Sequence, residues 1–370
     1  MKVIMLSTDK SVFDEHSSFR SRIADYAKLF DELYVVVATS GGYAEVNFSE
    51  QVRIIPTNSQ VKISTFTNFY KIAADIFKRD KTNFVITSQE EFGGFVCALL
   101  KWRYGVPWQA QIHSDIFSPY FKKFSYKNAI RSFIAARTLS YATRIRVVSK
   151  RIKKSIERRG IQTSVDILPI FVDVRQMQEI AENRIFTESG FDFVFLIVSR
   201  LAPEKNIAFA IAVFAEVVKR YPQTTLRIVG DGPMRSSLET LAASLKLGPH
   251  VQFEGWQKNI IGYLKAADCF LGTSWYEGYG LSLVEAMAAR LPIITTDVGI
   301  AGDLIVNNES GIVVSQGDAA AFFDAMIQIR SNSSQDFREK LGSGAYERVN
   351  QISSYKDYLA EYYNTLAQCL

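Results

Sequence analysis

Short apolar runs alternate with segments of helical periodicity along most of the chain. The runs lie on both sides of a weakly patterned stretch from Pro169 to Gly190. They are Val3–Leu6, Leu33–Ala38, Val52–Ile55, Phe84–Thr87, Trp108–Ile112, Ile145–Val148, Val165–Leu168, Phe193–Val198, Thr225–Val229, His250–Phe253, Cys269–Gly272, Ile293–Thr295 and Ile312–Val314. Near-continuous apolar strands between helices are typical of parallel sheets that helices cover on both faces. The pattern predicts an α/β protein.

The weak stretch after Pro169 divides this alternation into two halves. It holds a proline, a glycine and several acids but little apolar periodicity. We therefore expect two doubly wound, Rossmann-like domains, residues 1–170 and 171–350, whose strands end at a cleft between them. Residues 351–370 carry Tyr355, Tyr358, Leu359, Tyr362 and Leu366 at helical spacing, which predicts a final helix.

Composition excludes several classes of protein. Hydrophobic residues make up 48% of the 370 residues and charged residues 22%, as in an ordinary globular protein. The three cysteines are scattered, so they predict neither a disulfide framework nor a metal-binding pair, and a reducing compartment fits them best. No apolar run approaches the roughly 20 residues that span a bilayer. The start of the chain reads as a buried strand rather than a signal peptide.

Charge is distributed unevenly along the chain. The net charge is only +5, too small to indicate nucleic-acid binding, yet residues 101–160 hold fifteen Lys and Arg and two acids. This basic block indicates an anionic partner surface. Within it, residues 120–134 mix bulky aromatics with Lys122, Lys123, Lys127 and Arg131, a composition typical of an interfacial helix on a membrane. Buried aromatics beneath a solvated basic face, or a basic groove for a phosphorylated acceptor, are the alternatives.

The densest cluster of candidate chemistry follows the predicted strand at Cys269–Gly272. A loop containing Glu277 and Gly280 leads into a helix that begins near Leu281 or Ser282, with Glu285 one turn further on. Glycines before a helix N-terminus let the backbone approach an anion, which the free N–H groups and the helix dipole attract. Two carboxylates beside an anion site suit a sugar nucleotide, although both could equally be ordinary solvated side chains.

Two other predicted strands also end in candidate residues. Arg200 and Lys205 occupy the loop after Phe193–Val198, and such a pair suits phosphate groups, unless both are simply solvated. His113 follows Trp108–Ile112 and would face the predicted cleft, although a histidine at a strand end is often structural. The turn Val229–Pro233 has ordinary turn chemistry and is read as structural.

Other chemistries lack their signatures. The chain has no Asp-x-Asp motif, P-loop, Gly-x-Ser-x-Gly elbow or His-Glu-x-x-His helix. No Gly-x-Gly-x-x-Gly follows the first strand either, which weakens a dinucleotide interpretation.

Taken together, these motifs resemble the retaining glycosyltransferases of family 4, which have the GT-B fold. Glu277 and Glu285 resemble that family's Glu-x7-Glu motif, and Arg200 and Lys205 resemble its Arg-x4-Lys pair. The turn Val229–Pro233 also fits. The resemblance is strong from Val194 to about Val314 and only architectural, apart from His113, in the N-terminal half. It implies that the last helix packs back on the N-terminal domain.

The resemblance also implies roles for individual residues. Arg200 and Lys205 would bind the donor diphosphate, Glu285 the ribose, and Glu277 the transferred sugar. The amides of Gly280, Leu281 and Ser282 would lie near the diphosphate, His113 beside the reacting sugar, and Trp256 and Gln257 near the base. Catalysis would rest on His113, Glu277, Arg200 and Lys205. No metal or other cofactor is expected, because Arg and Lys supply the positive charge.

One region departs from the family pattern. Many members have a Gly-Gly loop after the first strand, whereas this chain has Ser7 to His16 without a glycine. We expect His16 or Arg20 to act on the acceptor side. The implied function is transfer of a sugar, with retention, from a nucleotide-diphosphate sugar to a glycan or lipid-linked acceptor in cell-surface polysaccharide or glycolipid biosynthesis. The enzyme would be cytoplasmic and peripheral at the inner face of the cell membrane.

Three alternatives share the predicted fold. A sugar-nucleotide 2-epimerase would bring more histidines and carboxylates to the cleft than three histidines allow. A glycan phosphorylase would need a lysine for pyridoxal phosphate, and none can be assigned. An inactive sugar-nucleotide-binding subunit would not need Glu277, Arg200 and Lys205. The identity of the donor sugar, base and acceptor stays open.

Overall fold

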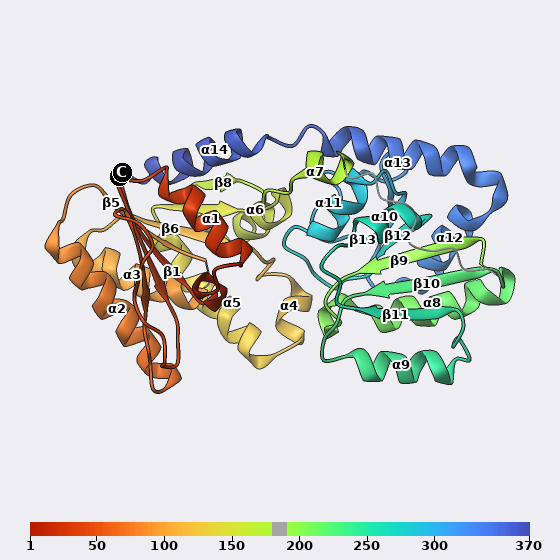
Figure 1. Ribbon diagram of the computed structural model, residues 1–370, viewed down its shortest axis with the longest axis horizontal. Coiled ribbons are helices and arrows are strands. Elements are labelled where there is room, and N and C mark those ends of the chain that lie inside the picture. Colours follow the sequence, from red (N-terminus) through yellow and green to blue (C-terminus); the bar gives the residue numbers. More distant parts are fainter. Residues whose placement is uncertain (90, 180–190) are drawn as a thin grey trace. The chain divides into compact units, whose positions relative to one another are not determined.

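A computed structural model describes residues 1–89, 91–179 and 191–370 of the chain (Figure 1). It divides into two compact units: unit 1 comprises Met1–Pro169 with Ser353–Leu370, and unit 2 comprises Ile170–Ile352. The expected boundaries after residues 170 and 350 lie within two residues of these. Residues 180–190 of the weakly patterned stretch lie outside the described residues.

Unit 1 contains an eight-stranded sheet in the order β3-β4-β2-β1-β5-β6-β7-β8. All neighbouring pairs are parallel except the short β3 and its partner β4. The strands are β1 (Lys2–Ser7), β2 (Glu32–Val37), β3 (Val46–Asn47), β4 (Val52–Pro56), β5 (Phe84–Ser88), β6 (Trp108–Ile112), β7 (Arg144–Val147) and β8 (Val165–Ile167). Periodicity predicted every strand of this sheet except β3, whose two residues are too few to show a pattern.

Helices cover both faces of this sheet. They are α1 (Ser18–Ala27), α2 (Lys62–Arg79), α3 (Glu91–Tyr104), α4 (Pro119–Lys123), α5 (Tyr126–Thr138), α6 (Lys150–Glu157), α14 (Tyr355–Ala367) and the 3₁₀ turns η1 (Lys10–Phe13) and η2 (Leu139–Tyr141). A Cβ on Gly94 of α3 would lie 3.1 Å from the ring of Trp108. The adjacent Gln109 instead donates to a carbonyl of α14. Successive residues of a strand point to opposite faces, so α3 and α14 cover opposite sides (Figure 1).

The last helix, α14, joins unit 1 through a buried polar network. Arg146 of β7 is 3% exposed, and its guanidinium donates to the hydroxyl of Tyr358 at 3.3 Å and to Oε1 of Gln111 at 3.1 Å. The same guanidinium donates to the carbonyl oxygen of Leu168 at 3.2 Å and lies 5.1 Å from the ring centre of Tyr362. The expected return of the last helix to the N-terminal unit is confirmed.

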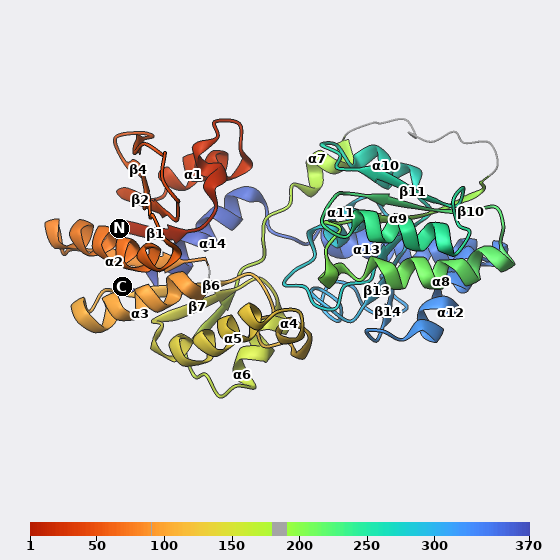
Figure 2. The same cartoon turned by 90° about the horizontal axis from the view of Figure 1, so that it is seen from below.

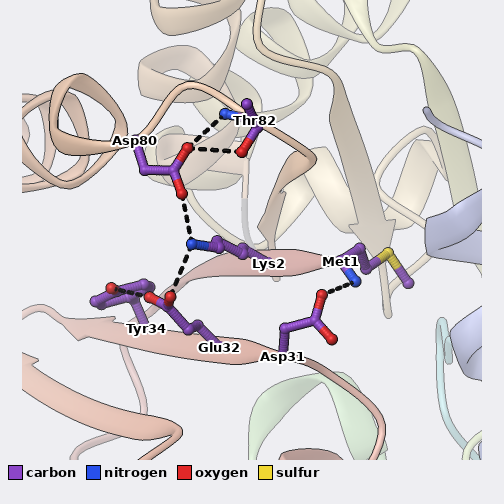
Figure 3. A network of polar contacts seen from close by, with 7 residues as sticks. All are labelled: Met1, Lys2, Asp31, Glu32, Tyr34, Asp80 and Thr82. Carbon is purple, nitrogen blue, oxygen red and sulfur yellow. Dashed lines mark hydrogen bonds and ion pairs between the residues drawn. The ribbon is translucent and has the colours of Figure 1, made fainter.

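A second polar network closes the amino-terminal end of the same sheet. The Lys2 ammonium is 2.6 Å from Asp80 and 2.8 Å from Glu32, and the Met1 amino group is 2.6 Å from Asp31 (Figure 3). The hydrogen bond to Lys2 holds the pKa of the Asp80 carboxyl below its usual range. These contacts join β1, β2 and the turn before β5, at the sheet end opposite to the strand carboxyl termini.

Unit 2 contains a six-stranded parallel sheet in the order β11-β10-β9-β12-β13-β14. The strands are β9 (Phe193–Val198), β10 (Thr224–Val229), β11 (Val251–Gly255), β12 (Cys269–Gly272), β13 (Ile293–Thr296) and β14 (Ile312–Val314). The helices are α7 (Val174–Glu179), α8 (Ile207–Arg220), α9 (Arg235–Ser244), α10 (Ile261–Ala266), α11 (Leu281–Ala288), α12 (Ala319–Arg330), α13 (Gln335–Val349) and the 3₁₀ turns η3 (Pro203–Lys205) and η4 (Asn332–Ser334). Each unit is thus a Rossmann-like α/β domain, as the sequence predicted.

The core of unit 2 explains why β9 is central. Phe195 and Ile197 of β9 are 0% and 3% exposed and pack in one cluster with Phe214 of α8 and Phe322 of α12. β9 pairs with β10 on one side and β12 on the other. The order of strands reverses at this position, and in open α/β sheets ligands bind outside the strand ends where the order reverses.

Candidate functional site

The carboxyl ends of β9 and β12 bring together two loops that are far apart in the sequence. Nζ of Lys205, in the loop after β9, donates to Oε1 of Glu277, in the loop after β12, 72 residues away. Oγ of Ser274 donates to the same carboxylate oxygen at 2.8 Å. Both members of the ion pair are about one-fifth exposed, so the pair is partly shielded from water. Two of the four charged residues predicted for a donor site, Lys205 and Glu277, therefore meet.

A pocket opens beside this ion pair. Lys205, Ser274, Glu277 and Ser282 contribute to its lining, together with the end of β9 at Ser199. The pocket lining, which also includes Thr273 and Thr295, therefore combines one cation, one carboxylate and five hydroxyl-bearing side chains on a floor of buried strands. Such a set can hold an anionic, hydroxyl-rich ligand by charge and hydrogen bonds.

Backbone and side-chain hydrogen bonds hold the two loops in register. The Thr273 hydroxyl donates to the carbonyl oxygen of Lys205 at 2.8 Å, and the amide of Trp275 donates to the carbonyl oxygen of Glu204 at 2.8 Å. The loop after β9 also packs tightly on the loop after β10. A Cβ on Gly230, whose φ is +132°, would lie 1.9 Å from the carbonyl oxygen of Ser199. The turn at Val229–Pro233 thus supports the site structurally.

Arg200 lies in the same loop as Lys205 but differs in exposure. Its side chain is 68% exposed and pairs with Glu204, four residues later. It does not line the pocket. An exposed guanidinium loses little hydration in this position, so it can exchange Glu204 for another anion at small cost.

The helix after the pocket begins at a glycine. Gly280 is the N-cap of α11 and has φ +98°, a conformation that glycine adopts at no steric cost. A glycine cap has no side chain to accept from the first helical amides. Leu281 and Ser282 start the helix, and no acid occupies its first turn. This helix start therefore favours an anion through its amides and its dipole.

Glu285 lies one turn inside α11 and is half-buried. Burial raises the pKa of its carboxyl, and no charge lowers it again. The surroundings of Glu285 thus disfavour the ionised carboxylate. A ligand that donates hydrogen bonds to the carboxylate would offset the free-energy cost of keeping it ionised in this position. It does not line the pocket at Glu277, so the two carboxylates occupy different environments.

The residues expected near the base stand apart from the pocket. Trp256 follows β11 and is 72% exposed. The Gln257 amide donates to the carbonyl oxygen of Glu254 at 2.9 Å. Neither contributes to the pocket, so their expected contact with a base stays a prediction.

Two residues of this site were not singled out from the sequence. Ser274 bonds to Glu277, and Ser199 has a buried hydroxyl without a hydrogen-bond partner among the described residues. A serine at a strand end is too common to signal a site. Only the position of Ser199 in the pocket wall marks its hydroxyl as available to a ligand.

In unit 1, His113 follows the end of β6 and is half-buried. Burial lowers its pKa to about 3, and the positive charges of Arg146 and Arg22 add to that effect. The imidazole therefore stays neutral across the physiological range. A neutral ring can accept or donate a hydrogen bond, but it brings no positive charge to a leaving phosphate.

The two acceptor-side candidates also lie in unit 1, around η1 and α1. His16 is exposed, and its backbone amide donates to Asp14 at 3.0 Å. The Arg20 guanidinium lies 5.3 Å from the ring centre of Phe48, 3.8 Å from Glu15, and donates to the Phe13 carbonyl oxygen at 3.4 Å. Arg20 is thus built into the loop, whereas the His16 ring is open to solvent.

The structure corrects the interpretation of residues 120–134 as one interfacial helix. The chain forms two helices, α4 and α5, because Ser118 and Ser125 each cap a separate helix start. Phe121 is 2% exposed, so the aromatic residues do not share one face. Lys123 and Lys127 are exposed, Lys122 is half-buried, and the Arg131 guanidinium lies 5.2 Å from the ring centre of Phe121.

The basic block is also less uniform than its composition indicates. Arg146 is buried, as described above, and Arg144 is 2.6 Å from Asp166. These two arginines are structural and do not contribute to a cationic surface. Sequence alone counted them as surface charges because it does not show which face of β7 is covered.

Two further classes of site can be assessed in the described part of the chain. There, no three His, Cys, Asp or Glu side chains gather in a way that could hold a metal ion. No helix within the described ranges is long and apolar enough to span a bilayer.

Comparison with known proteins shows that the segment holding this site is similar to a known family. The family model for glycosyl transferases group 1 matches residues 178–348, which contain the whole of the Lys205–Glu277 site. An uncharacterized glycosyltransferase of Methanocaldococcus jannaschii is 32% identical over 186 residues, 47% of this chain and 45% of that protein. The alpha-monoglucosyldiacylglycerol synthase of Acholeplasma laidlawii is 35% identical over 143 residues, 38% of this chain and 35% of that protein.

A third relative is an Escherichia coli galactosyltransferase whose name describes transfer from UDP-Gal to a GlcNAc-diphosphoundecaprenol. It is 29% identical over 177 residues, 45% of this chain and 44% of that protein. In each case the aligned segment covers less than half the length of the curated relative.

Solved structures match the chain over its whole length. Sucrose-phosphate synthase from Thermosynechococcus elongatus has a TM-score of 0.81 at 19% identity, covering 100% of this chain and 99% of that one. The Anabaena protein HepE in complex with UDP has a TM-score of 0.71 at 19% identity, covering 99% and 100%. These likenesses support the GT-B fold. The family likeness itself rests on residues 178–348, which match the model for glycosyl transferases group 1.

Proposed function

We propose that this protein is a retaining glycosyltransferase that moves a sugar from a nucleotide-diphosphate sugar to a glycan or lipid-linked acceptor. The observation that carries the proposal is the Lys205–Glu277 ion pair in the wall of a pocket at the β9/β12 reversal. Charge of both signs, five hydroxyl-bearing side chains and a helix start meet there. A phosphate with an attached sugar needs such a set of partners.

The role of each residue follows from its position. Lys205 binds the diphosphate, and Glu277 then exchanges its bond to the ammonium for sugar hydroxyls. The amides of Gly280, Leu281 and Ser282 add partial positive charge at the diphosphate. Arg200, exposed beside the pocket, closes on the outer phosphate. Glu285 accepts from ribose hydroxyls, which relieves the cost of its burial.

The carboxylate at the site acts by positioning the sugar. A nucleophilic carboxylate attacks best when its oxygens are free, whereas Glu277 accepts hydrogen bonds from both Lys205 and Ser274. Such contacts occupy lone pairs of the carboxylate and hold it in place. We propose front-face attack, in which the leaving phosphate takes the proton of the acceptor hydroxyl. His113 stays neutral and donates or accepts a hydrogen bond at the reacting sugar.

The donor and acceptor classes draw support from the relatives. HepE is in complex with UDP, and two of the relatives described above carry a diacylglycerol and a diphosphoundecaprenol in their names. A uridine nucleotide and a lipid-linked acceptor are therefore the first to test. We propose that the protein works in glycolipid or polysaccharide biosynthesis, without a metal ion, at the anionic surface of a membrane. His16 and Arg20 are our acceptor-side candidates.

A donor panel tests this function. Purified protein is incubated with UDP-, GDP- and ADP-sugars, and release of nucleoside diphosphate is measured with and without membrane lipid extract. We expect one base to support release, faster with lipid and unchanged by EDTA. Retention is read from the anomeric configuration of the product by NMR. A protein that binds a nucleotide but releases no diphosphate from any donor would instead be an inactive binding subunit.

A further inference from the structure

We propose that the face formed by α3 and α5 of unit 1 inserts into the headgroup boundary of an anionic lipid leaflet. The inference rests on the proposed function only for its choice of setting. It replaces the single basic helix expected from composition with a two-helix surface that only the fold assembles. We call this surface the α3/α5 face.

Each of the two helices exposes an apolar stripe. The exposed residues recur at spacings of four and three in both helices, so each set lies along one side of its helix. Opposite sides are buried: Val96, Cys97 and Leu100 of α3 are at most 1% exposed. The exposed residues, with their exposed fractions, are Phe95 (45%), Leu99 (39%), Trp102 (82%), Tyr126 (74%), Ile130 (48%) and Phe133 (60%).

The two stripes belong to one surface. α3 packs beside both α2 and α5, and Figure 2 shows α2, α3 and α5 along one side of the sheet of unit 1. Both helices bury the side that faces the strands and expose the other. Six large apolar side chains on adjacent helices make an exposed cluster of a kind that soluble surfaces seldom carry without a partner.

The positive charge around the α3/α5 face favours an anionic lipid surface as its partner. Arg103, Lys123, Lys127 and Arg137 are exposed on α3, α4 and α5, and the sequence of these three helices contains a single acid, Glu91, at the first residue of α3. Arg137 lies 4.9 Å from the ring centre of Phe133, and Lys123 lies 5.5 Å from that of Tyr120, so cations and rings alternate at close range. Aromatic rings flanked by cations suit the headgroup layer of a membrane. The rings can insert between the headgroups, while the Lys and Arg side chains contact the lipid phosphates.

Co-sedimentation with vesicles tests the α3/α5 face. The full-length protein is mixed at low salt with phosphatidylglycerol-rich vesicles or with neutral phosphatidylcholine vesicles. We expect binding to the anionic vesicles alone, falling as salt rises, because the cations act within a Debye length of the surface. Recovery in the supernatant with anionic vesicles, or equal binding to both kinds, would overturn the proposal.

Matched variants separate the two contributions. Lys123→Glu with Lys127→Glu, and separately Trp102→Ser with Phe133→Ser, should each weaken binding at least about tenfold. The controls are Lys340→Glu with Lys356→Glu, which make the same charge change on α13 and α14, and Leu245→Ser at an exposed apolar residue of unit 2. If the controls weaken binding as much as the α3/α5 variants, the effect is one of net charge or hydrophobicity and the face is not the docking site.

The depth to which the α3/α5 face inserts can be measured from the fluorescence of Trp102. Brominated lipids should quench the fluorescence of the wild-type protein, and Trp102→Phe should lose most of that quenching while still binding. Quenching that survives in Trp102→Phe would place the membrane contact elsewhere.

Donor hydrolysis separates this proposal from the proposed function. In the absence of vesicles, the variants of the α3/α5 face should hydrolyse donor as fast as the wild type. If all variants lack hydrolysis but bind vesicles as predicted, the proposed function fails and the α3/α5 face stands. A dimer in solution that Trp102→Ser with Phe133→Ser abolishes would assign the face to a second copy.

Discussion

Nζ of Lys205 and Oε1 of Glu277 neutralise each other in an ion pair. The ammonium belongs to the loop after β9 and the carboxylate to the loop after β12. A diphosphate that takes Lys205 must displace Glu277, which is then free to accept from the hydroxyls of the attached sugar. Under the proposed function, the pair would link recognition of the phosphates to recognition of the sugar.

Replacing Lys205 with alanine should impair the enzyme more than replacing Arg200. Losing one charge-assisted phosphate contact costs about 1.5–3 kcal/mol, so kcat/KM should fall about tenfold or more in both variants. Lys205→Ala also leaves the Glu277 carboxylate without its cation, and that charge repels the incoming diphosphate. Steady-state kinetics and calorimetric binding of UDP check the order, with Lys219→Ala, an exposed lysine of α8, as control. Wild-type kinetics in both variants would place the donor site elsewhere.

Glu277→Gln and Glu285→Gln should affect different kinetic constants. Glu277 is assigned to the transferred sugar, where charge develops in the transition state, so its variant should lower kcat. Glu285 is assigned to the ribose, where binding is nearly equal in the ground and transition states, so its variant should raise KM. Kinetics with a saturable donor measure both. A pure KM effect at Glu277 would reverse the two assignments.

Glu285→Gln should also change how stability depends on pH. Burial raises the pKa of Glu285, so the folded state holds a proton that the unfolded chain has already released. The free energy of unfolding of the wild type therefore falls as pH rises from the unfolded pKa, about 4.3, through the raised value. The glutamine variant lacks this loss.

We accordingly expect Glu285→Gln to gain stability relative to the wild type as pH rises from 4 to 7. Urea unfolding at each pH measures the difference. Glu277→Gln is the matched control, because its carboxylate is paired with Lys205 and its removal should not stabilise the protein. A constant difference between Glu285→Gln and wild type from pH 4 to 7 would contradict the assigned cost of burial.

His113 should stay neutral at every pH at which the enzyme works. Its folded pKa of about 3 lies below the unfolded value of about 6.5. Between these values the unfolded chain binds more protons, so the free energy of unfolding drops as pH falls from 6.5 toward 3. His113→Asn should lose part of this acid sensitivity. NMR of the imidazole carbon-bound protons checks the titration directly, and an inflection between pH 5 and 8 would refute it.

Arg146 should be among the most sensitive positions for stability in unit 1. Arg146→Met leaves Tyr358, Gln111 and the carbonyl oxygen of Leu168 without their buried donor. Several unsatisfied groups together should cost at least about 3 kcal/mol. Urea denaturation measures this against Arg158→Met, an exposed arginine just after α6. An unchanged unfolding midpoint in Arg146→Met would show that the other contacts of α14, such as the Gln109 hydrogen bond, hold this helix without Arg146.

The sequence by itself determined the order of elements and the position of most site residues at strand ends. Apolar runs and their periodicity are local properties, so β9 and β12 were predicted within a residue of their observed bounds. The placement of Lys205, Glu277 and His113 after strands followed directly from those runs. The two-residue strand β3 was missed because it is too short to carry a pattern.

Only the tertiary structure decided which of these residues meet and which are covered. The pairing of β9 with β12 brings Lys205 to Glu277, and no local pattern encodes that pairing across 72 residues. Burial of Arg146 beneath α14 removes it from the basic surface, whereas Trp102 and Phe133 become exposed on the opposite side of the sheet. Composition treats all these side chains alike, because burial depends on which segment of the folded chain packs against each face.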